Sequence, residues 1–232
     1  AKEWFKAYFP TIEVVATDYK DLLASDKIDA VYCAVPHNLH EKMYIDIIRA
    51  KKHLFGEKPF GIDKKANDAI MQAVRENPDV IVRASSEFPF FPAVKMVTEW
   101  AKAKKYGRLI EVRSGFHHSS DMDLTKPINW KRRAATNGAY GCMGDLGMHV
   151  CHVPFRAGWS VRNVRAILSK IVAERPDGKG GRAPCETWDN ATLFCEARDP
   201  SDGALFPLTL KTQRIAPGEK DTWYLEILGT RA

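Results

Sequence analysis

Three side chains that can exchange protons, Lys58, Asp145 and His149, occur in two short motifs far apart in the sequence. Lys58 is the middle residue of Glu-Lys-Pro at 57–59, and the other two lie in Gly-Asp-Leu-Gly-Met-His at 144–149. On a helix, a four-residue spacing places the carboxylate and the imidazole on one face. A lysine, a carboxylate and an imidazole that accepts protons near neutral pH can move a proton on and off a substrate hydroxyl. We therefore predict that all three residues are catalytic.

The segment around Lys58 alternates between short apolar strands and amphipathic helices. The expected strands are 29–35, 53–56 and 80–84, and the expected helices are 41–50 and 64–76. Short apolar strands separated by helices are typical of a buried parallel sheet. Ligands bind at the carboxyl ends of such strands, which is where Lys58 lies. Residues 1–84 are therefore predicted to form the second part of a Rossmann-like dinucleotide-binding domain.

Residues 85–232 have a different pattern, which predicts an α+β domain. The expected elements are helices from Pro92 to about 104 and over 142–157, a strand at 109–116, a long polar loop at 119–141, and strands near 161–174, 190–198, 205–214 and 222–228. Consecutive strands without helices between them predict a mainly antiparallel sheet. We expect this open sheet to serve substrate binding and to join identical chains into a dimer or tetramer.

Six strings in the chain resemble, in their order and spacing, the glucose–fructose oxidoreductase / inositol dehydrogenase (Gfo/Idh/MocA) family. The matching positions are 29–36, 37–40, 57–59, Trp130, 144–149 and 226–232. Each string alone is weak, and together they are specific for the family, though not for one substrate. The resemblance implies NAD or NADP as cofactor and a small polyol, sugar or cyclitol as substrate.

Substrate contacts are expected for four residues, Lys58, His117, Asp145 and His149. The resemblance implies the contact of Lys58, whereas His117 is expected to reach the substrate because it lies at a strand end before the long loop. In this scheme His149 removes the proton of the hydroxyl that is oxidised, Lys58 stabilises the developing alkoxide, and Asp145 binds substrate hydroxyls and orients the site. A partly buried lysine beside another cation has a lowered pKa, which suits it to proton transfer.

The resemblance also implies a set of residues beside the cofactor. They are Pro36, His37, Asn38, His40, Glu57, Lys58 and Trp130. Two of them have a simpler explanation that stays open. His40 could be a helix-start residue packed on the sheet, and Trp130 could be a packing anchor.

The sequence departs from the family in lacking the phosphate-binding string G-x-G-x-x-G. Members of the family carry this loop on their first strand. Their chains also continue into further strands beyond the position equivalent to residue 232. We therefore expect that the chain lacks a first βαβ unit and is incomplete at both ends. The phosphate-binding glycines and the ribose-binding residue cannot be assigned, and residues 1–232 alone are expected to be poorly soluble and to bind NAD or NADP weakly.

Composition narrows the class of protein. The chain has 232 residues, 45% of them hydrophobic, and a net charge of +6. The basic residues are scattered and do not alternate with aromatic residues, so we expect no nucleic-acid partner. No apolar run of about 18 residues occurs, so no membrane-spanning helix is expected. The expected compartment is the cytoplasm, although a periplasmic or secreted protein stays open.

The five cysteines form neither pairs at C-x-x-C spacing nor an even set. This pattern argues against a disulfide framework and suits a reducing compartment. Cys142, His149, Cys151 and His152 lie close in sequence, but they lack the paired spacing of structural zinc sites, and no metal is expected.

The function predicted from these features is an NAD(P)-dependent dehydrogenase that transfers a hydride between nicotinamide and a secondary hydroxyl of a sugar or cyclitol. Two alternatives stay open. One is a glycosidase that uses transient oxidation by the same cofactor. The other is a non-catalytic, cofactor-sensing regulator of the same fold, which retention of Lys58, Asp145 and His149 disfavours.

Overall fold

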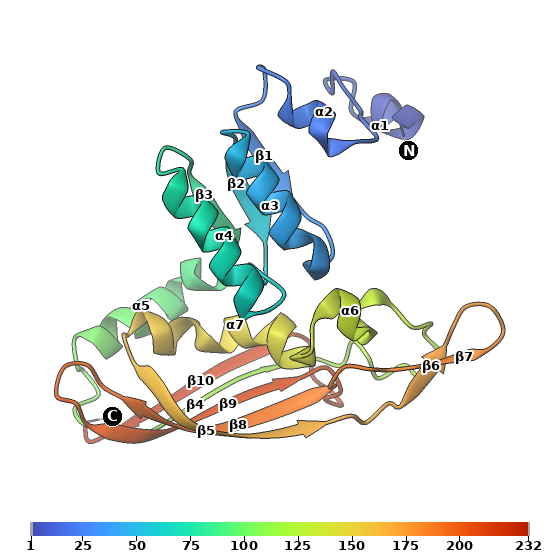
Figure 1. Ribbon diagram of the computed structural model, residues 1–232. Coiled ribbons are helices and arrows are strands. Elements are labelled where there is room, and N and C mark those ends of the chain that lie inside the picture. The colour runs from blue at the N-terminus through green and yellow to red at the C-terminus, as the bar shows by residue number, and fades with distance from the viewer. Residues whose placement is uncertain (1, 232) are drawn as a thin grey trace.

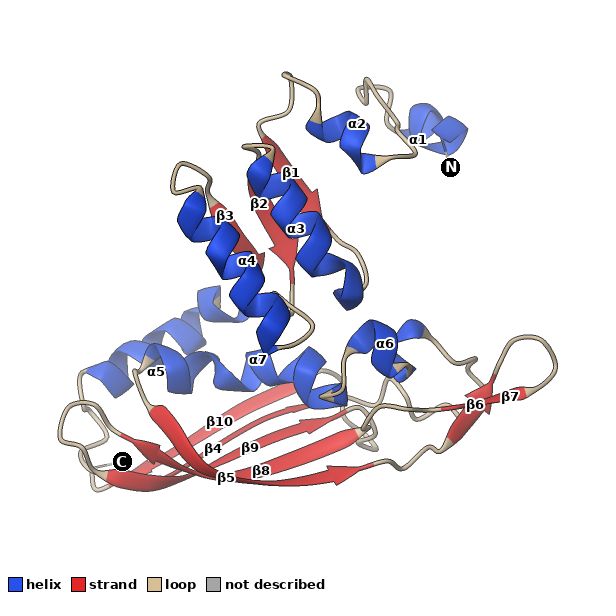
Figure 2. Cartoon of the chain, in the orientation of Figure 1, coloured by secondary structure: helices blue, strands red, loops and turns tan. Residues whose placement is uncertain are grey.

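The computed structural model describes residues 2–231, which form two large sheets and a two-stranded ribbon, with helices between and above the large sheets (Figures 1 and 2). The helices are α1 (Lys2–Tyr8), α2 (Tyr19–Leu23), α3 (His40–Arg49), α4 (Lys64–Glu76), α5 (Pro92–Lys102), α6 (Ala134–Asn137) and α7 (Gly141–Arg156), with 3-10 turns η1 (His37–Leu39), η2 (Phe88–Phe90) and η3 (Trp130–Arg132). The strands are β1 (Ala30–Cys33), β2 (His53–Glu57), β3 (Val82–Ser85), β4 (Leu109–His117), β5 (Ser160–Ser169), β6 (Glu174–Pro176), β7 (Arg182–Pro184), β8 (Asn190–Arg198), β9 (Leu205–Gln213) and β10 (Thr222–Gly229).

The first sheet is parallel, with the strand order β1-β2-β3. Helices α3 and α4 cover one of its faces (Figure 1), and Tyr44, Ile48, Leu54 and Ile70 form the centre of that core. The N-terminus of α4 is capped by Asp63, whose carboxylate accepts a hydrogen bond of 2.8 Å from the Ala66 amide. The predicted βαβαβ pattern is confirmed.

The second sheet has the order β10-β4-β9-β8-β5 and is mixed rather than purely antiparallel. Strands β4 and β9 run parallel, and the other three pairings are antiparallel. Helix α7 lies on one face (Figure 2), where Leu146 and Val150 pack against Val112 and Leu208. A mainly antiparallel open sheet was predicted, and this arrangement confirms it.

The opposite face of the second sheet exposes apolar side chains such as Phe194 and Leu205. Their neighbours Cys195 and Phe206 belong to the core under α7, so the alternation of the strands turns Phe194 and Leu205 outward. Association of identical chains through this face stays a prediction.

The strand predicted near 161–174 is present as β5, but its predicted end was wrong because the chain leaves the sheet at Ser169. The amides of Ile171 and Val172 donate to the carboxylate of Asp189, at 2.7 and 2.9 Å, instead of to a neighbouring strand. Strands β6 and β7 then form a separate two-stranded ribbon. The predicted loop at 119–141 was also incomplete, since it contains η3 and α6.

Candidate active site

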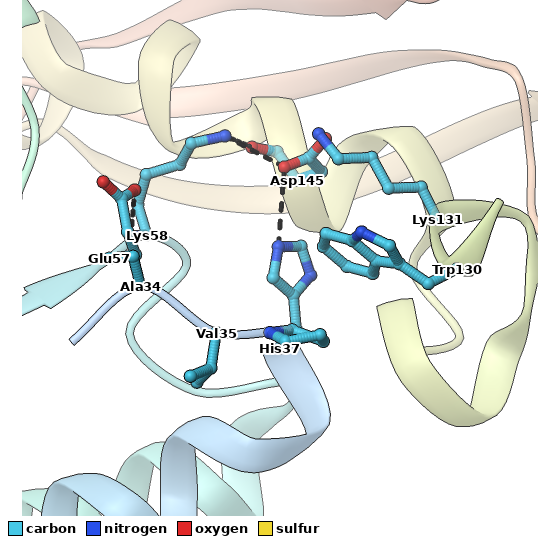
Figure 3. Close-up of a pocket in the computed structure, with 9 residues that line it drawn as sticks. Ala34, Val35, His37, Glu57, Lys58, Trp130, Lys131 and Asp145 are labelled. Carbon is cyan, nitrogen blue, oxygen red and sulfur yellow. Dashed lines mark hydrogen bonds and ion pairs between the residues drawn. The ribbon is translucent and has the colours of Figure 1, made fainter. Parts of the chain in front are cut away.

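The two predicted motifs meet where the first sheet faces helix α7. Lys58 follows the last residue of β2, and its Nζ lies 2.9 Å from Oδ1 of Asp145 in the first half of α7. The same ammonium group also donates to the Asp145 carbonyl at 3.2 Å. Figure 3 shows the two side chains pointing toward each other from these separate elements.

The carboxylate of Asp145, only 1% exposed, is surrounded by basic side chains. Besides Lys58, the Nζ of Lys131 lies 3.1 Å from Oδ2, and the guanidinium of Arg214 contacts the same oxygen. His37 approaches Oδ1 with its Nε2 at 3.6 Å. Burial lowers the pKa of His37 to about 4, so this imidazole is neutral and leaves three cations around one carboxylate.

Asp145 and the basic side chains around it lie between two cavities. Cavity I, of about 330 Å³, lies at the carboxyl ends of β1 and β2. Its lining residues are Ala34, Val35, Pro36, His37, Glu57, Lys58, Trp130, Lys131 and Asp145. Cavity II, of about 550 Å³, lies between α7 and the end of the second sheet, and its lining includes Lys58, Phe88, His118, Lys131, Asp145, His149 and Arg214. Lys58, Lys131 and Asp145 line both cavities, so they form the partition between them.

Most residues predicted to contact the cofactor line cavity I. Pro36, His37, Glu57, Lys58 and Trp130 all do so. The indole of Trp130 stands edge-on to the His37 ring, with 4.7 Å between the ring centroids. Figure 3 shows Trp130 and His37 on one side of the cavity and Glu57 on the other.

Asn38 and His40, the other two residues predicted at the cofactor, do not line either cavity. Asn38 is exposed on η1. The ring nitrogens of His40 lie 2.7 Å from the Pro59 carbonyl and 2.8 Å from the Val35 carbonyl, and the ring stacks on Tyr44. His40 therefore ties the loop after β1 to the loop after β2, as the packing explanation expects.

His149 lines cavity II and is buried among aromatic rings. Its centroid lies 4.4 Å from that of Phe88 and 5.0 Å from that of Phe116, and its backbone carbonyl accepts a hydrogen bond from the Trp223 indole at 2.9 Å. Burial, followed by the charge of Lys58, lowers the pKa of His149 to about 3. The imidazole is therefore neutral and able to accept a proton. Its pKa in this environment lies below the near-neutral range that the sequence reasoning expected.

The sequence reasoning expected His117 to reach the substrate, but its neighbour His118 lines the cavity instead. Phe116 faces the core under α7, so the two-residue period of the strand turns His118 to the same side and His117 to the other. His118 lines cavity II, whereas the His117 ring packs edge-on against Tyr224, at 5.3 Å between centroids. The alternation of β4 was the signal that could have identified His118.

Lys131 and Arg214 are the other site residues that sequence reasoning missed. Lys131 follows Trp130 on η3, and Arg214 follows the last residue of β9. Burial and the charges of Arg214 and Lys58 lower the pKa of Lys131 to about 8. Burial also lowers the pKa of Arg214 to about 10. The only sequence signal was that Lys131 begins a short basic cluster.

Behind the cavities, a second set of buried charges holds η3 and the end of β9 in place. Arg132 contacts Asp121 and bonds to Asp189 at 2.9 Å, and Asp121 also lies 4.0 Å from the Arg214 guanidinium. Because Asp189 also accepts two backbone amides, this chain of ion pairs links the loop before α6 to the sheet.

The described residues contain neither a cluster suited to a metal ion nor a helix able to span a membrane. Within residues 2–231, no group of three or more His, Cys, Asp or Glu side chains is placed to hold a metal ion. Over the same residues, every helix is too short or too polar to cross a membrane.

Comparison with known proteins identifies the first part of the chain. Residues 3–85 match the oxidoreductase family with an NAD-binding Rossmann fold known as Gfo/Idh/MocA. Levoglucosan dehydrogenase of Pseudarthrobacter phenanthrenivorans is 25% identical over 71% of this chain and 42% of its own length. An uncharacterized oxidoreductase of Synechocystis is 28% identical over 91% of this chain and 55% of its own.

Solved structures extend the likeness across nearly the whole chain. Levoglucosan dehydrogenase in complex with NADH and L-sorbose superposes with a TM-score of 0.86 over 99% of this chain and 59% of its own, at 24% identity. An NAD-binding oxidoreductase from Klebsiella pneumoniae gives 0.84 over 99% and 58%, at 25% identity. The chain thus spans about half the length of the curated relatives that it matches. Residues 3–85 thus match the NAD-binding Rossmann fold of the Gfo/Idh/MocA oxidoreductase family.

Proposed function

We propose that this protein is an NAD(P)-dependent dehydrogenase that oxidises a secondary hydroxyl of a sugar, cyclitol or related polyol. The observation that carries the proposal is the 2.9 Å ion pair between Lys58 and Asp145 in the partition between two cavities. A residue in that partition can contact a cofactor on one side and a substrate on the other. Names among its relatives, levoglucosan dehydrogenase and scyllo-inositol 2-dehydrogenase (NADP(+)), support this substrate class.

The residues of cavity I suit the nicotinamide end of the cofactor. The cavity offers the Trp130 indole, the neutral His37 imidazole and the backbone at two strand ends, which together fit a flat ring that carries an amide. The string G-x-G-x-x-G is not in the sequence, so the residues present do not account for pyrophosphate binding. When bound, the cofactor supplies the hydride acceptor.

In cavity II, the chain's own residues would bind the substrate and move its proton. The neutral imidazole of His149 accepts the hydroxyl proton, and the ammonium of Lys58 stabilises the negative charge that develops on the oxygen. The developing anion favours the imidazolium, which offsets the low pKa of His149 in the free site. Asp145 holds Lys58 in place, and Phe88 and Phe116 exclude water around the imidazole.

The direct test is to follow reduction of NAD and of NADP by absorbance while the protein is offered a panel of hexoses, cyclitols and anhydrosugars. Reduction by at least one secondary alcohol, with the ketone identified as product, is the expected result. Failure of every secondary alcohol with both cofactors would refute the proposal. Cleavage of a glycoside without net cofactor reduction would point instead to the glycosidase alternative.

A further inference from the structure

Counting buried and half-buried side chains, the wall of cavity II carries more positive than negative charge. Three cationic side chains line it, with side-chain exposures of 20% for Lys58, 33% for Lys131 and 4% for Arg214. The only carboxylate buried in the same wall is that of Asp145. His118 and His149 add no charge, because burial lowers the pKa of His118 to about 4 and of His149 to about 3.

The other acidic residues do not remove this excess. Glu87 and Asp221 also line the cavity, but both are exposed, so water screens their charges. Asp121 and Asp189 are buried behind the wall, where Arg132 contacts both of them and Asp121 also lies 4.0 Å from the Arg214 guanidinium. With these groups included, the four cations Lys58, Lys131, Arg132 and Arg214 face the three carboxylates of Asp121, Asp145 and Asp189. Buried cations without matching anions are costly unless a ligand completes the set.

We propose that the substrate is a polyol that carries an anionic group, a carboxylate or a phosphate, held by Lys131 and Arg214 in cavity II. This inference rests on the proposed dehydrogenase function and narrows its substrate class. Lys58 and His149 remain with the hydroxyl that reacts, while the anionic group lies toward Lys131 and Arg214. The volume of about 550 Å³ is ample for a six-carbon sugar acid or sugar phosphate.

The lowered pKa of Lys131, about 8, agrees with an excess of cations over carboxylates around cavity II. Burial is its first cause and the charges of Arg214 and Lys58 follow, so the Asp145 carboxylate that Lys131 shares with these two cations does not fully offset them. An anion bound beside it would raise that pKa and favour the charged lysine.

The test compares three probes that share one carbon skeleton: glucitol, gluconate and glucitol 6-phosphate. Calorimetry on the whole protein, without cofactor, measures binding separately from turnover. We expect at least one anionic probe to bind about tenfold or more tightly than glucitol, as hydrogen bonds to charged groups imply. The tighter of the two acids identifies the anionic group as carboxylate or phosphate. Equal binding of the three probes, or no binding of either acid, would overturn the proposal.

Substitutions test whether the preference for an anionic probe arises in cavity II. Lys131→Gln should abolish the preference for the anionic probe, and Lys131→Arg, which keeps the charge, should restore it. Lys179→Gln removes one positive charge from the exposed ribbon between β6 and β7 and should change nothing. A preference that survives in Lys131→Gln would also refute the assignment. Tight binding of an acid, together with failure of every secondary alcohol with NAD and NADP, would leave the anion site intact and refute the dehydrogenase. Oxidation of a secondary alcohol without any preference for the acids would support the dehydrogenase and refute the anion site.

Discussion

Lys58 and Asp145, 87 positions apart in the sequence, form a salt bridge in which the lysine also donates to the backbone carbonyl of its partner. The ammonium therefore binds α7 through both the side chain and the main chain of one residue. This double contact fixes the end of the Lys58 side chain at the partition between the two cavities. Its position depends on the first sheet and α7 remaining in contact.

Replacing Lys58 by methionine keeps the side-chain bulk and removes the ammonium. We expect turnover to fall by at least about a hundredfold, the lower end of what a positioned proton-transfer group contributes. Cofactor binding should change little, because the cavity I lining otherwise stays intact. Steady-state kinetics together with cofactor titration checks this, and near-normal turnover would remove Lys58 from the chemistry.

Asp145→Asn leaves three cations around a neutral amide, so it should lower the free energy of unfolding. Removing one partner of a buried ion pair costs about 3 kcal/mol or more. Urea unfolding measures the change. Asp68→Asn, on the surface of α4 where the carboxylate pairs with Lys64, is the matched control and should shift stability by no more than about 0.5 kcal/mol. Similar effects of both substitutions would contradict the role of Asp145 in holding the cluster.

The pH dependence of alcohol oxidation should show no limb from His149 between about pH 5 and 8. With its pKa lowered to about 3, the imidazole is already neutral throughout that interval. His149→Asn should therefore slow oxidation by a similar factor at every pH, on the order of a hundredfold. The profiles of kcat/KM for both proteins decide this. A limb near the ordinary histidine pKa that disappears in the variant would contradict the buried environment described for His149.

The protein should lose stability as the pH falls from 7 to 5. Burial lowers the pKa of His37, His118 and His152 to about 4 and of His149 to about 3. The unfolded chain takes up these protons below its histidine pKa, whereas the folded chain does not, so acid favours unfolding. The slope should exceed about 1.4 kcal/mol per pH unit, the value for a single proton. Urea midpoints at pH 7, 6 and 5 measure it, and a flat profile would show that the imidazoles titrate normally in the fold.

The elements that the sequence predicted best are those determined by neighbouring residues. The boundaries of α4 follow from the Asp63 cap and a regular apolar spacing, both of which are local. The parallel pairing of β4 with β9 was not predictable in this way, because residues 118–204 lie between the two strands. The early end of β5 depends on the distant carboxylate of Asp189, which captures the next two amides.

The same distinction between local and distant determinants applies to the residues of the site. Lys58 was predictable from its place at a strand end, and Asp145 and His149 from their spacing on one helix. Arg214 looked like any other arginine, because only the fold brings the end of β9 against α7. His117 was chosen because it lies at a strand end before the long loop, but the alternation of β4 turns its neighbour His118 toward cavity II.

The sharing of one carboxylate by several partners has a consequence for protein engineering. Asp145 contacts Lys58, Lys131 and Arg214, so a substitution at any of them alters the electrostatic environment of the others. The effects of single substitutions in this cluster should therefore not add, whereas those of distant surface sites should. Directed evolution of substrate preference would then proceed through paired replacements, and single-site libraries would miss combinations that only work together.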